Sequence, residues 1–258
     1  MSEAKKSDWD LRRDIVLVSR WMYDRQLVVA KDGNVSCRSG DGSFLMTPSG
    51  CCKGTVAEDD LVRVDMEGRV LSGSRKPTSE IVMHIAAYRA RPDVSAIVHA
   101  HPITAVALSV AGITMAQCVV PETVIVFGQI PTAPYATATT PAMATALEGI
   151  VETADAIVLD RHGSLTLGRD VFDAFYKLEM LEHAAKITHA ARLVGEVRSL
   201  PPDEVQRLLE VRQKLGITGP VHVDPKHCNL CGLCPGPPGK QRGTARPAPV
   251  ESPTGSDY

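Results

Sequence analysis

The chain has 258 residues, of which 44% are hydrophobic, and this suits one large domain, or two small ones, with a packed core. Its formal net charge of −2 argues against the basic surface of a protein that binds nucleic acid or anionic membranes. The sequence contains no run of eighteen apolar residues, the length needed to span a membrane. Its first ten residues lack the apolar segment of a secretory signal. The seven cysteines are odd in number and unevenly spaced, so we expect no disulfide framework and a reducing, cytoplasmic location.

Helical and strand patterns alternate in the first part of the chain. Ser7 followed by Asp10 predicts a helix start, and apolar residues then recur at helical spacing. Short apolar pieces separated by Gly, Asp, Asn and Ser predict strands and tight turns in residues 27–50 and again in 61–73. Residues 76–93 begin with helix-capping residues and predict a second helix.

The later elements are mixed in the same way. In chain order we predict a buried strand in 94–102, a helix from Pro102 to about Gly112, a strand within 123–135, a helix opened by Thr140 and Pro141, a hairpin in 156–168 turning at His162 and Gly163, a helix from Asp170 to about Gly195, and a last helix in 202–216. Because strands and helices do not follow strict βαβ alternation, we predict one α/β domain with a mostly antiparallel central sheet flanked by helices.

The helix predicted in 202–216 closes the ordered part of the chain. We place the boundary at residue 218, and a tail follows in 219–258. From about Pro235 the tail is rich in Pro, Gly, Ser and charge, which predicts disorder because such a segment cannot bury a core.

Two histidines, His99 and His101, lie one residue apart at the end of the buried strand. Side chains alternate across a strand, so both point to the same face, where they can share a divalent metal. The alternative is that one caps the next helix and the other is simply buried. A catalytic zinc needs a third protein ligand, and we choose His162, because it lies in a Gly-containing turn directly after a buried strand.

Glu80 lies at the start of the helix predicted in 76–93. An acid at this position commonly interacts only with the helix dipole. His84, one turn later, is expected to pack rather than to bind a ligand. The same helix start nevertheless suits an anion through its free backbone N–H groups. Further donors in this region suited to a phosphate or polyhydroxy substrate are Lys76, Thr78, Ser79, Gly33, Asn34, Ser36, Ser49, Gly50 and Lys53.

The motifs GNVS, TPSG, KPTSE followed by MH, AIVHAHP and a later HG occur here in this order. Over residues 8–218 the chain resembles the class II aldolase/adducin family, and PYATATT after GQIP is similar to its L-fuculose-phosphate aldolase branch. The resemblance implies a three-layer α/β/α fold around an antiparallel sheet. It also implies a cyclic homotetramer with sites at the subunit interfaces.

The same resemblance implies roles for individual residues. His99, His101 and His162 would bind one zinc, or another divalent ion, per subunit. Glu80 would be the catalytic acid/base, and a fourth metal ligand before substrate arrives. Tyr135, offered from a neighbouring subunit, would protonate the aldehyde oxygen. The phosphate would be held by Gly33, Asn34, Ser49, Gly50, Thr78 and Ser79.

The expected reaction is reversible cleavage of a ketose 1-phosphate, of the fuculose or 5-deoxy or methylthio-ribulose type, to dihydroxyacetone phosphate and a short aldehyde. A divalent ion stabilises the charge that develops on the substrate oxygens, a carboxylate moves the proton, and phosphate binding holds the reacting carbons in place.

Other reactions of the family remain open. A 4-epimerase is less favoured because those enzymes carry aspartate at the position of Glu80. A dehydratase or a decarboxylase is not excluded by a glutamate there. A non-enzymatic, adducin-like scaffold is disfavoured because the metal histidines and Glu80 are all present.

The tail contains a run that the resemblance does not explain. Cys228, Cys231 and Cys234 have Cys-x-x-Cys-x-x-Cys spacing and follow His227. A ferredoxin-type cluster would need a fourth cysteine, whereas three thiolates with His227 or another cysteine would suit a structural zinc. Whether this run binds a second metal, an iron–sulfur cluster or nothing is left open by the sequence.

Overall fold

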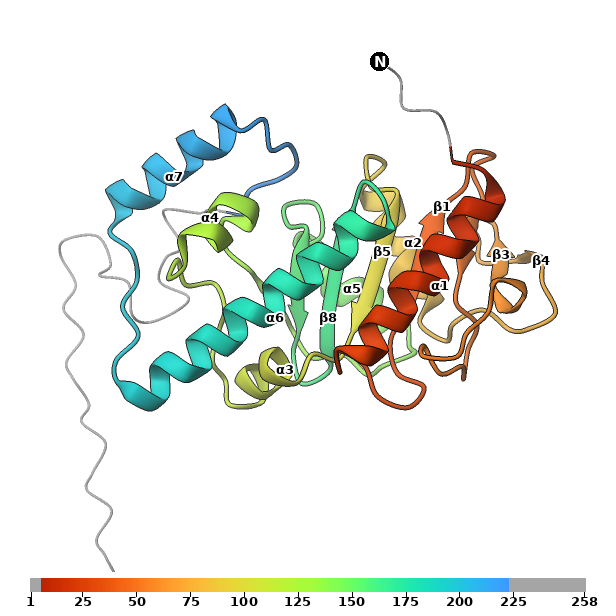
Figure 1. The fold of residues 1–258 in the computed structure, drawn as a ribbon, viewed down its shortest axis with the longest axis horizontal. Helices are drawn as coiled ribbons and strands as arrows, with labels where there is room; N and C mark the ends of the chain where they lie inside the picture. The colour runs from red at the N-terminus through yellow and green to blue at the C-terminus, as the bar shows by residue number, and fades with distance from the viewer. Residues whose placement is uncertain (1–5, 223–258) are drawn as a thin grey trace, which may run out of the picture.

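The computed structural model describes residues 6–222 (Figure 1). Residues 223–258, which include Cys228, Cys231 and Cys234, lie outside the described residues. The strands are β1 (Asn34–Arg38), β2 (Phe44–Met46), β3 (Val62–Val64), β4 (Val70–Ser72), β5 (Ala96–Ala100), β6 (Thr132–Ala133), β7 (Ala156–Leu159) and β8 (Gly163–Gly168). The α-helices are α1 (Asp8–Asp24), α2 (Ile81–Ala90), α3 (Ile103–Val110), α4 (Pro121–Phe127), α5 (Ala142–Leu147), α6 (Val171–Val194) and α7 (Pro202–Lys214).

The strands form one eight-stranded sheet in the order β4-β3-β2-β1-β5-β8-β7-β6. Within the described residues, neighbouring strands are antiparallel except β6 and β7, which are parallel. This confirms the predicted, mostly antiparallel sheet. The strand that carries His99, β5, lies near the middle of the sheet, between β1 and β8.

Helices cover both faces of the sheet, as predicted. Helices α1 and α6 cross one face, and α2 and α5 lie on the other (Figure 1). The two-residue period of β5 serves both layers: Ala96 and Val98 pack with residues of α1 and α6, whereas Ile97 packs with residues of α2 and α5. The fold is therefore three-layered, α/β/α.

Local capping signals predicted the starts of α1 and α6 well, whereas α2, also predicted to begin with capping residues, has no side-chain cap. At the start of α1 the backbone N–H of Asp10 donates to the Ser7 hydroxyl, and the Asp10 carboxylate accepts from the Ser7 N–H, which completes a capping box. The carboxylate of Asp170 caps α6 by accepting from the N–H of Asp173 at 2.9 Å. These predictions succeed because a cap depends on residues only a few positions apart.

One predicted strand is largely wrong. Within 123–135 the apolar run up to Phe127 forms helix α4, and only Thr132–Ala133 form a strand. Pro121 occupies the first turn of α4, where its missing N–H has no cost. Val124 and Phe127 are buried on one side of this helix. A short run of β-branched residues fits a strand or a buried helix equally well by pattern.

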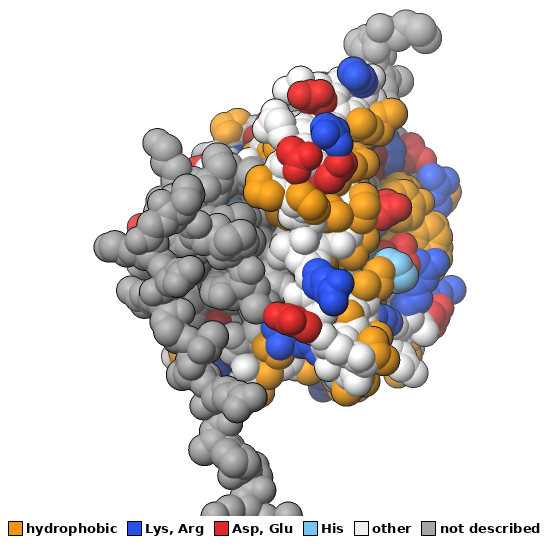
Figure 2. Space-filling view, turned by 90° about the vertical axis from the view of Figure 1, so that its left-hand side faces the viewer, with side chains coloured by type: hydrophobic (Ala, Val, Ile, Leu, Met, Phe, Trp, Pro, Cys, Tyr) orange, Lys and Arg blue, Asp and Glu red, His pale blue; other side chains and the backbone are white. Residues whose placement is uncertain are grey.

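Helix α7 packs beside α4 at one end of the molecule. The Arg212 guanidinium donates to the carbonyls of Ile125 and Val126, which lie in the last turn of α4 and lack helical partners. The face at this end, seen in Figure 2, mixes acidic, basic and hydrophobic side chains, in line with the near-neutral net charge. No helix in residues 6–222 is long and apolar enough to cross a membrane.

Candidate functional site

The predicted site residues come together at one end of the sheet because of strand order. The carboxyl end of β5 lies beside the amino ends of its antiparallel neighbours β1 and β8, and Asn34 pairs with His99 in the register. His101 follows β5 and His162 precedes β8. Glu80, at the N-cap of α2, reaches the same place from the neighbouring helix layer.

Two glycines allow this close approach. Gly33, before β1, has a φ of +70°, and a Cβ there would lie 2.8 Å from the carbonyl oxygen of His99. A Cβ on Gly163 would lie 2.3 Å from the carbonyl oxygen of Ala100. Any larger residue would push β1 or β8 away from the end of β5, so the glycines keep the histidines within reach of one another.

The three histidines form a ligand set that fits a divalent metal. One ring nitrogen from each of His99, His101 and His162 lies within 4.8 Å of the others. The Nε2 atoms of His99 and His101 are 3.0 Å apart, close to the separation of about 3.3 Å expected for two nitrogens on one tetrahedral zinc. The structure thus brings together the three residues proposed from the sequence.

The outer ring nitrogens of two of these histidines face polar groups. Nδ1 of His99 lies 2.9 Å from the Ser164 carbonyl, a contact that turns Nε2 toward the other histidines, where a metal would bind. Nδ1 of His101 lies 3.4 Å from the Asp32 carboxylate. Burial, together with the nearby His99 and His162, lowers the pKa of His101 to about 4, so this ring is neutral near pH 7. Neutral imidazole is the form that binds metals.

Glu80 faces the histidines and does not cap its helix. Its side chain makes no capping hydrogen bond. Oε1 lies 3.2 Å from Nε2 of His162, and Oε2 lies 3.1 Å from Nε2 of His99. Nδ2 of Asn34 donates to Oε2 at 2.9 Å. Burial by itself raises the pKa of Glu80, but the two histidines outweigh it and hold that pKa well below its ordinary value. The carboxylate is therefore ionised.

A cavity of about 210 Å³ opens beside Glu80. The TPSG and KPTS segments are joined here, because the N–H of Ser49 donates to the carbonyl of Lys76 at 3.0 Å and Pro48 forms a β-bridge with Pro77. The cavity lining includes all six residues assigned to the phosphate: Gly33, Asn34, Ser49, Gly50, Thr78 and Ser79. Hydroxyl, amide and backbone donors in one small cavity suit a phosphate group.

Some predicted donors lie elsewhere. Ser36 is in β1 rather than in a turn, and its buried hydroxyl bonds to His84 and Tyr88. Lys76 does not line the cavity. Lys53 does, but it is buried and its ammonium donates to backbone carbonyls, including that of Cys51.

Tyr135 lies just beyond β6 and is 62% exposed. It does not line the cavity of its own chain, although Ala138, three residues later, does. The role assigned to Tyr135 therefore stays a prediction.

Sequence reasoning missed three groups near the histidines: the Asp32 carboxylate, the Ser164 carbonyl and the His84 ring. Asp32 directly precedes the GNVS motif, and this position is the sequence signal by which it could have been found. A backbone carbonyl carries no sequence signal. His84 was expected to pack, and it is fully buried, but its ring also bonds to Asn34.

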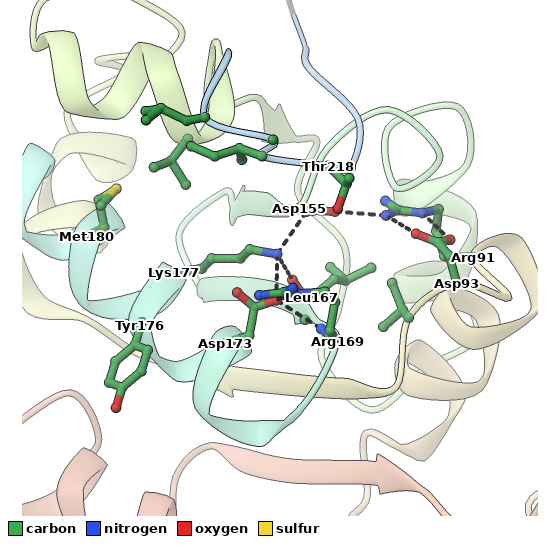
Figure 3. A pocket seen from close by; sticks show the side chains of 17 residues that line it. Arg91, Asp93, Asp155, Leu167, Arg169, Asp173, Tyr176, Lys177, Met180 and Thr218 are labelled. Atoms are coloured by element: carbon green, nitrogen blue, oxygen red, sulfur yellow. Dashed lines mark hydrogen bonds and ion pairs between the residues drawn. The ribbon is translucent and has the colours of Figure 1, made fainter. Parts of the chain in front are cut away.

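A larger cavity, of about 770 Å³, lies in a different part of the protein (Figure 3). It lies where β5 begins and β8 ends, opposite the histidines. Asp155 accepts from Arg91 and Lys177 at 2.8 Å each, and Lys177 also contacts Asp173 at 3.2 Å. Because these charges satisfy one another, we do not assign the active site to this cavity.

Comparison with known proteins decides the family. The sequence profile named Class II Aldolase and Adducin N-terminal domain matches residues 13–189. The chain belongs to the class II aldolase and adducin family. An L-fuculose phosphate aldolase of Methanocaldococcus jannaschii is 37% identical over 177 residues, which cover 69% of this chain and 94% of that protein.

Further relatives of this class II aldolase family protein differ in their reaction. A 3-oxo-tetronate 4-phosphate decarboxylase of Escherichia coli is 31% identical over 214 residues, covering 81% of this chain and 99% of that protein. The solved structure of an L-fuculose 1-phosphate aldolase superposes with a TM-score of 0.74 at 28% identity, covering 81% of this chain and 98% of the other. The family and fold are thus shared by enzymes that act on different substrates.

Proposed function

We propose that this protein is a metal-dependent aldolase that reversibly cleaves a ketose 1-phosphate to dihydroxyacetone phosphate and a short aldehyde. The observation that carries the proposal is the Glu80 carboxylate, which contacts two of three convergent histidines at the edge of a phosphate-suited cavity. The similarity to L-fuculose phosphate aldolases supports the same reaction.

His99, His101 and His162 would hold the metal, most simply one zinc per subunit, because neutral imidazoles are good zinc ligands and leave a position open. When bound, the ion supplies positive charge that stabilises the anionic character developing on the substrate oxygens.

The remaining steps belong to the protein's own groups. Thr78, Ser79 and the TPSG turn bind the phosphate and thereby fix the distance from the reacting carbons to Glu80. Glu80 takes or returns the proton on the carbon whose bond to the aldehyde fragment is formed or broken.

A homotetramer would complete the site. Tyr135 is exposed on a loop whose Ala138 lines the cavity, so its phenol is free to enter the site of a neighbouring subunit. There it would protonate the aldehyde oxygen in the condensation direction.

A decarboxylase acting on a four-carbon sugar-acid phosphate is the second candidate. It is favoured by the Escherichia coli relative, whose match extends over most of both chains. The same metal and phosphate groups would serve this reaction, with carbon dioxide as the leaving fragment. An adducin-like scaffold is less favoured, because a buried carboxylate and clustered histidines are costly unless a function retains them.

The test is a retro-aldol assay with the metal-loaded protein and a panel of ketose 1-phosphates, with detection of dihydroxyacetone phosphate. A parallel reaction contains 3-oxo-tetronate 4-phosphate and detects carbon dioxide. Dihydroxyacetone phosphate from at least one ketose supports the aldolase. Carbon dioxide without dihydroxyacetone phosphate would contradict the aldolase and identify the protein as a decarboxylase.

A further inference from the structure

A buried chain of hydrogen bonds leads from the core of the protein to Glu80. The Tyr88 hydroxyl lies 2.9 Å from the Ser36 hydroxyl, which lies 2.7 Å from Nδ1 of His84. Nε2 of His84 bonds to Oδ1 of Asn34, and Nδ2 of Asn34 bonds to Oε2 of Glu80. Apart from Glu80, which is 9% exposed, every member is at most 3% exposed.

The donors and acceptors along this series of hydrogen bonds can be arranged in only one direction. Nδ2 of Asn34 donates to the Glu80 carboxylate, so the NH2 group of the amide is turned toward Glu80. Oδ1 of Asn34 then faces His84 and can only accept, which places the ring proton of His84 on Nε2. Nδ1 of His84 accepts from Ser36, and Ser36 accepts from Tyr88. All hydrogens point toward Glu80, an arrangement in which each bond strengthens the next.

His84 stays in the required neutral form. Burial, with a smaller contribution from His99, lowers the pKa of His84 to about 3. A neutral ring has one donor and one acceptor nitrogen, and the chain uses both. If His84 lost its Nε2–H donor, the Asn34 amide could rotate and present its oxygen to the Glu80 carboxylate, which is repulsive.

Asn34 also touches the cavity. Its side chain has two N–H groups, of which one is used by Glu80, and Asn34 is among the residues that line the anion cavity. The orientation that holds Glu80 therefore leaves the second N–H available for an anion in that cavity.

We propose that His84 is a positioning residue that locks the Asn34 amide, so that one N–H holds Glu80 and the other binds the substrate phosphate. The inference rests on the proposed function for the identity of the anion. It implies that phosphate binding and the position of the acid/base are linked through one amide group.

Two variants test this in the full, metal-loaded protein. His84→Phe removes the donor but fills the space, whereas His84→Gln keeps an N–H donor toward Asn34 and an acceptor toward Ser36. For His84→Phe we expect inorganic phosphate to bind about 10- to 100-fold more weakly by calorimetry. We also expect solvent exchange of the dihydroxyacetone phosphate C–H to slow by about the same factor in its maximal rate. His84→Gln should stay within a few-fold of the wild type.

The control is Met83→Leu, a buried change on the same helix that leaves the hydrogen-bond chain intact. This variant should alter thermal stability without altering phosphate affinity or exchange. That is the result expected of any residue whose role is only structural. A folded, metal-loaded His84→Phe with wild-type phosphate affinity and exchange would overturn the proposal.

A second measurement needs no variant. Nitrogen-15 chemical shifts of the wild-type imidazoles should show His84 as the neutral Nε2–H tautomer at pH 7. An Nδ1–H tautomer would contradict the inferred direction. Neither the shifts nor phosphate affinity depends on sugar-phosphate cleavage, so failure of the proposed reaction would be recognised separately.

Discussion

Glu80 shows how tertiary contacts give a residue its role. An acid at a helix start ordinarily gains a few tenths of a kcal/mol from the helix dipole. Here the side chain leaves the helix end and contacts His99, His162 and Asn34. A buried carboxylate in such contacts is a candidate for proton transfer, because its protonation state depends on its neighbours.

Replacing this carboxylate should abolish proton transfer while leaving the site assembled. Glu80→Gln retains the size and part of the hydrogen bonding, so the exchange of the dihydroxyacetone phosphate C–H with solvent should fall about 100-fold or more. Glu122→Gln is the matched control, since Glu122 also lies in the first turn of a helix but is exposed. Unchanged exchange in Glu80→Gln would leave Glu80 as a helix-start acid only.

The metal should depend on the histidines at the end of β5. A His99→Ala, His101→Ala double variant retains only one imidazole of the three, and we expect near-complete loss of metal by elemental analysis. The exposed helix α6 histidines provide the control: a His183→Ala, His189→Ala double variant should keep full occupancy. Full occupancy in the first variant would refute the site.

Burial of His84 predicts a pH dependence of stability. The unfolded chain binds a proton on His84 below about pH 6.5, whereas the folded chain does so only near pH 3. Lowering the pH between these values therefore favours unfolding, by up to about 1.4 kcal/mol per pH unit. In urea unfolding at a series of pH values, wild type should lose stability faster than His84→Gln across this window. Parallel curves would contradict the prediction.

At the scale of elements, the two ends of the sheet hold different groups of side chains. One end gathers the histidines. The other holds an ion network in which Asp155, at the edge of β7, joins Arg91 at the end of α2 to Lys177 of α6 (Figure 3). The Asp155 side chain is 9% exposed. The network therefore ties together helices on opposite faces of the sheet.

Removing Asp155 should cost much more than removing its exposed counterpart. Asp155→Ala leaves Arg91 and Lys177 buried without this partner, for which we expect a loss of about 3–5 kcal/mol in the free energy of unfolding. Asp93→Ala removes the other carboxylate on Arg91, but its side chain is 61% exposed, so we expect a loss below about 1 kcal/mol. Chemical denaturation measures both. Equal losses would show that burial does not govern this network.

At the scale of the whole molecule, residues 6–222 contain the sheet, its helices and the histidines, Glu80 and cavity residues described above. The last described contacts are backbone hydrogen bonds, from the N–H of Gln129 to the carbonyl of His222 at 2.8 Å and from the N–H of His222 to the carbonyl of Phe127 at 3.3 Å. The domain boundary proposed at residue 218 stays a prediction.

Truncation after His222 should therefore keep the three-histidine metal and at least part of the activity. Any metal lost with the tail would be a second, thiolate-bound species, and its absorbance would distinguish iron–sulfur from colourless zinc. The measurements are metal content, oligomeric state and activity before and after truncation. Loss of activity from folded, assembled subunits would place the tail in the active site.

Much of this protein could be predicted from short-range patterns. The capping at Ser7 and Asp170, the buried strand and the shared face of His99 and His101 all follow from periodicity and capping, which act over a few residues. The motif order indicated the family, and the comparisons confirmed it.

Tertiary structure decided what these patterns leave open. Whether the run ending at Phe127 forms helix or strand depended on packing beside α7, because its apolar pattern fits both. The chain from Tyr88 to Glu80 needs β1 and α2, which are about 50 residues apart, to lie face to face. Only the order of strands in the sheet sets such distances, so the donor to Asn34 could not be read from the sequence by itself.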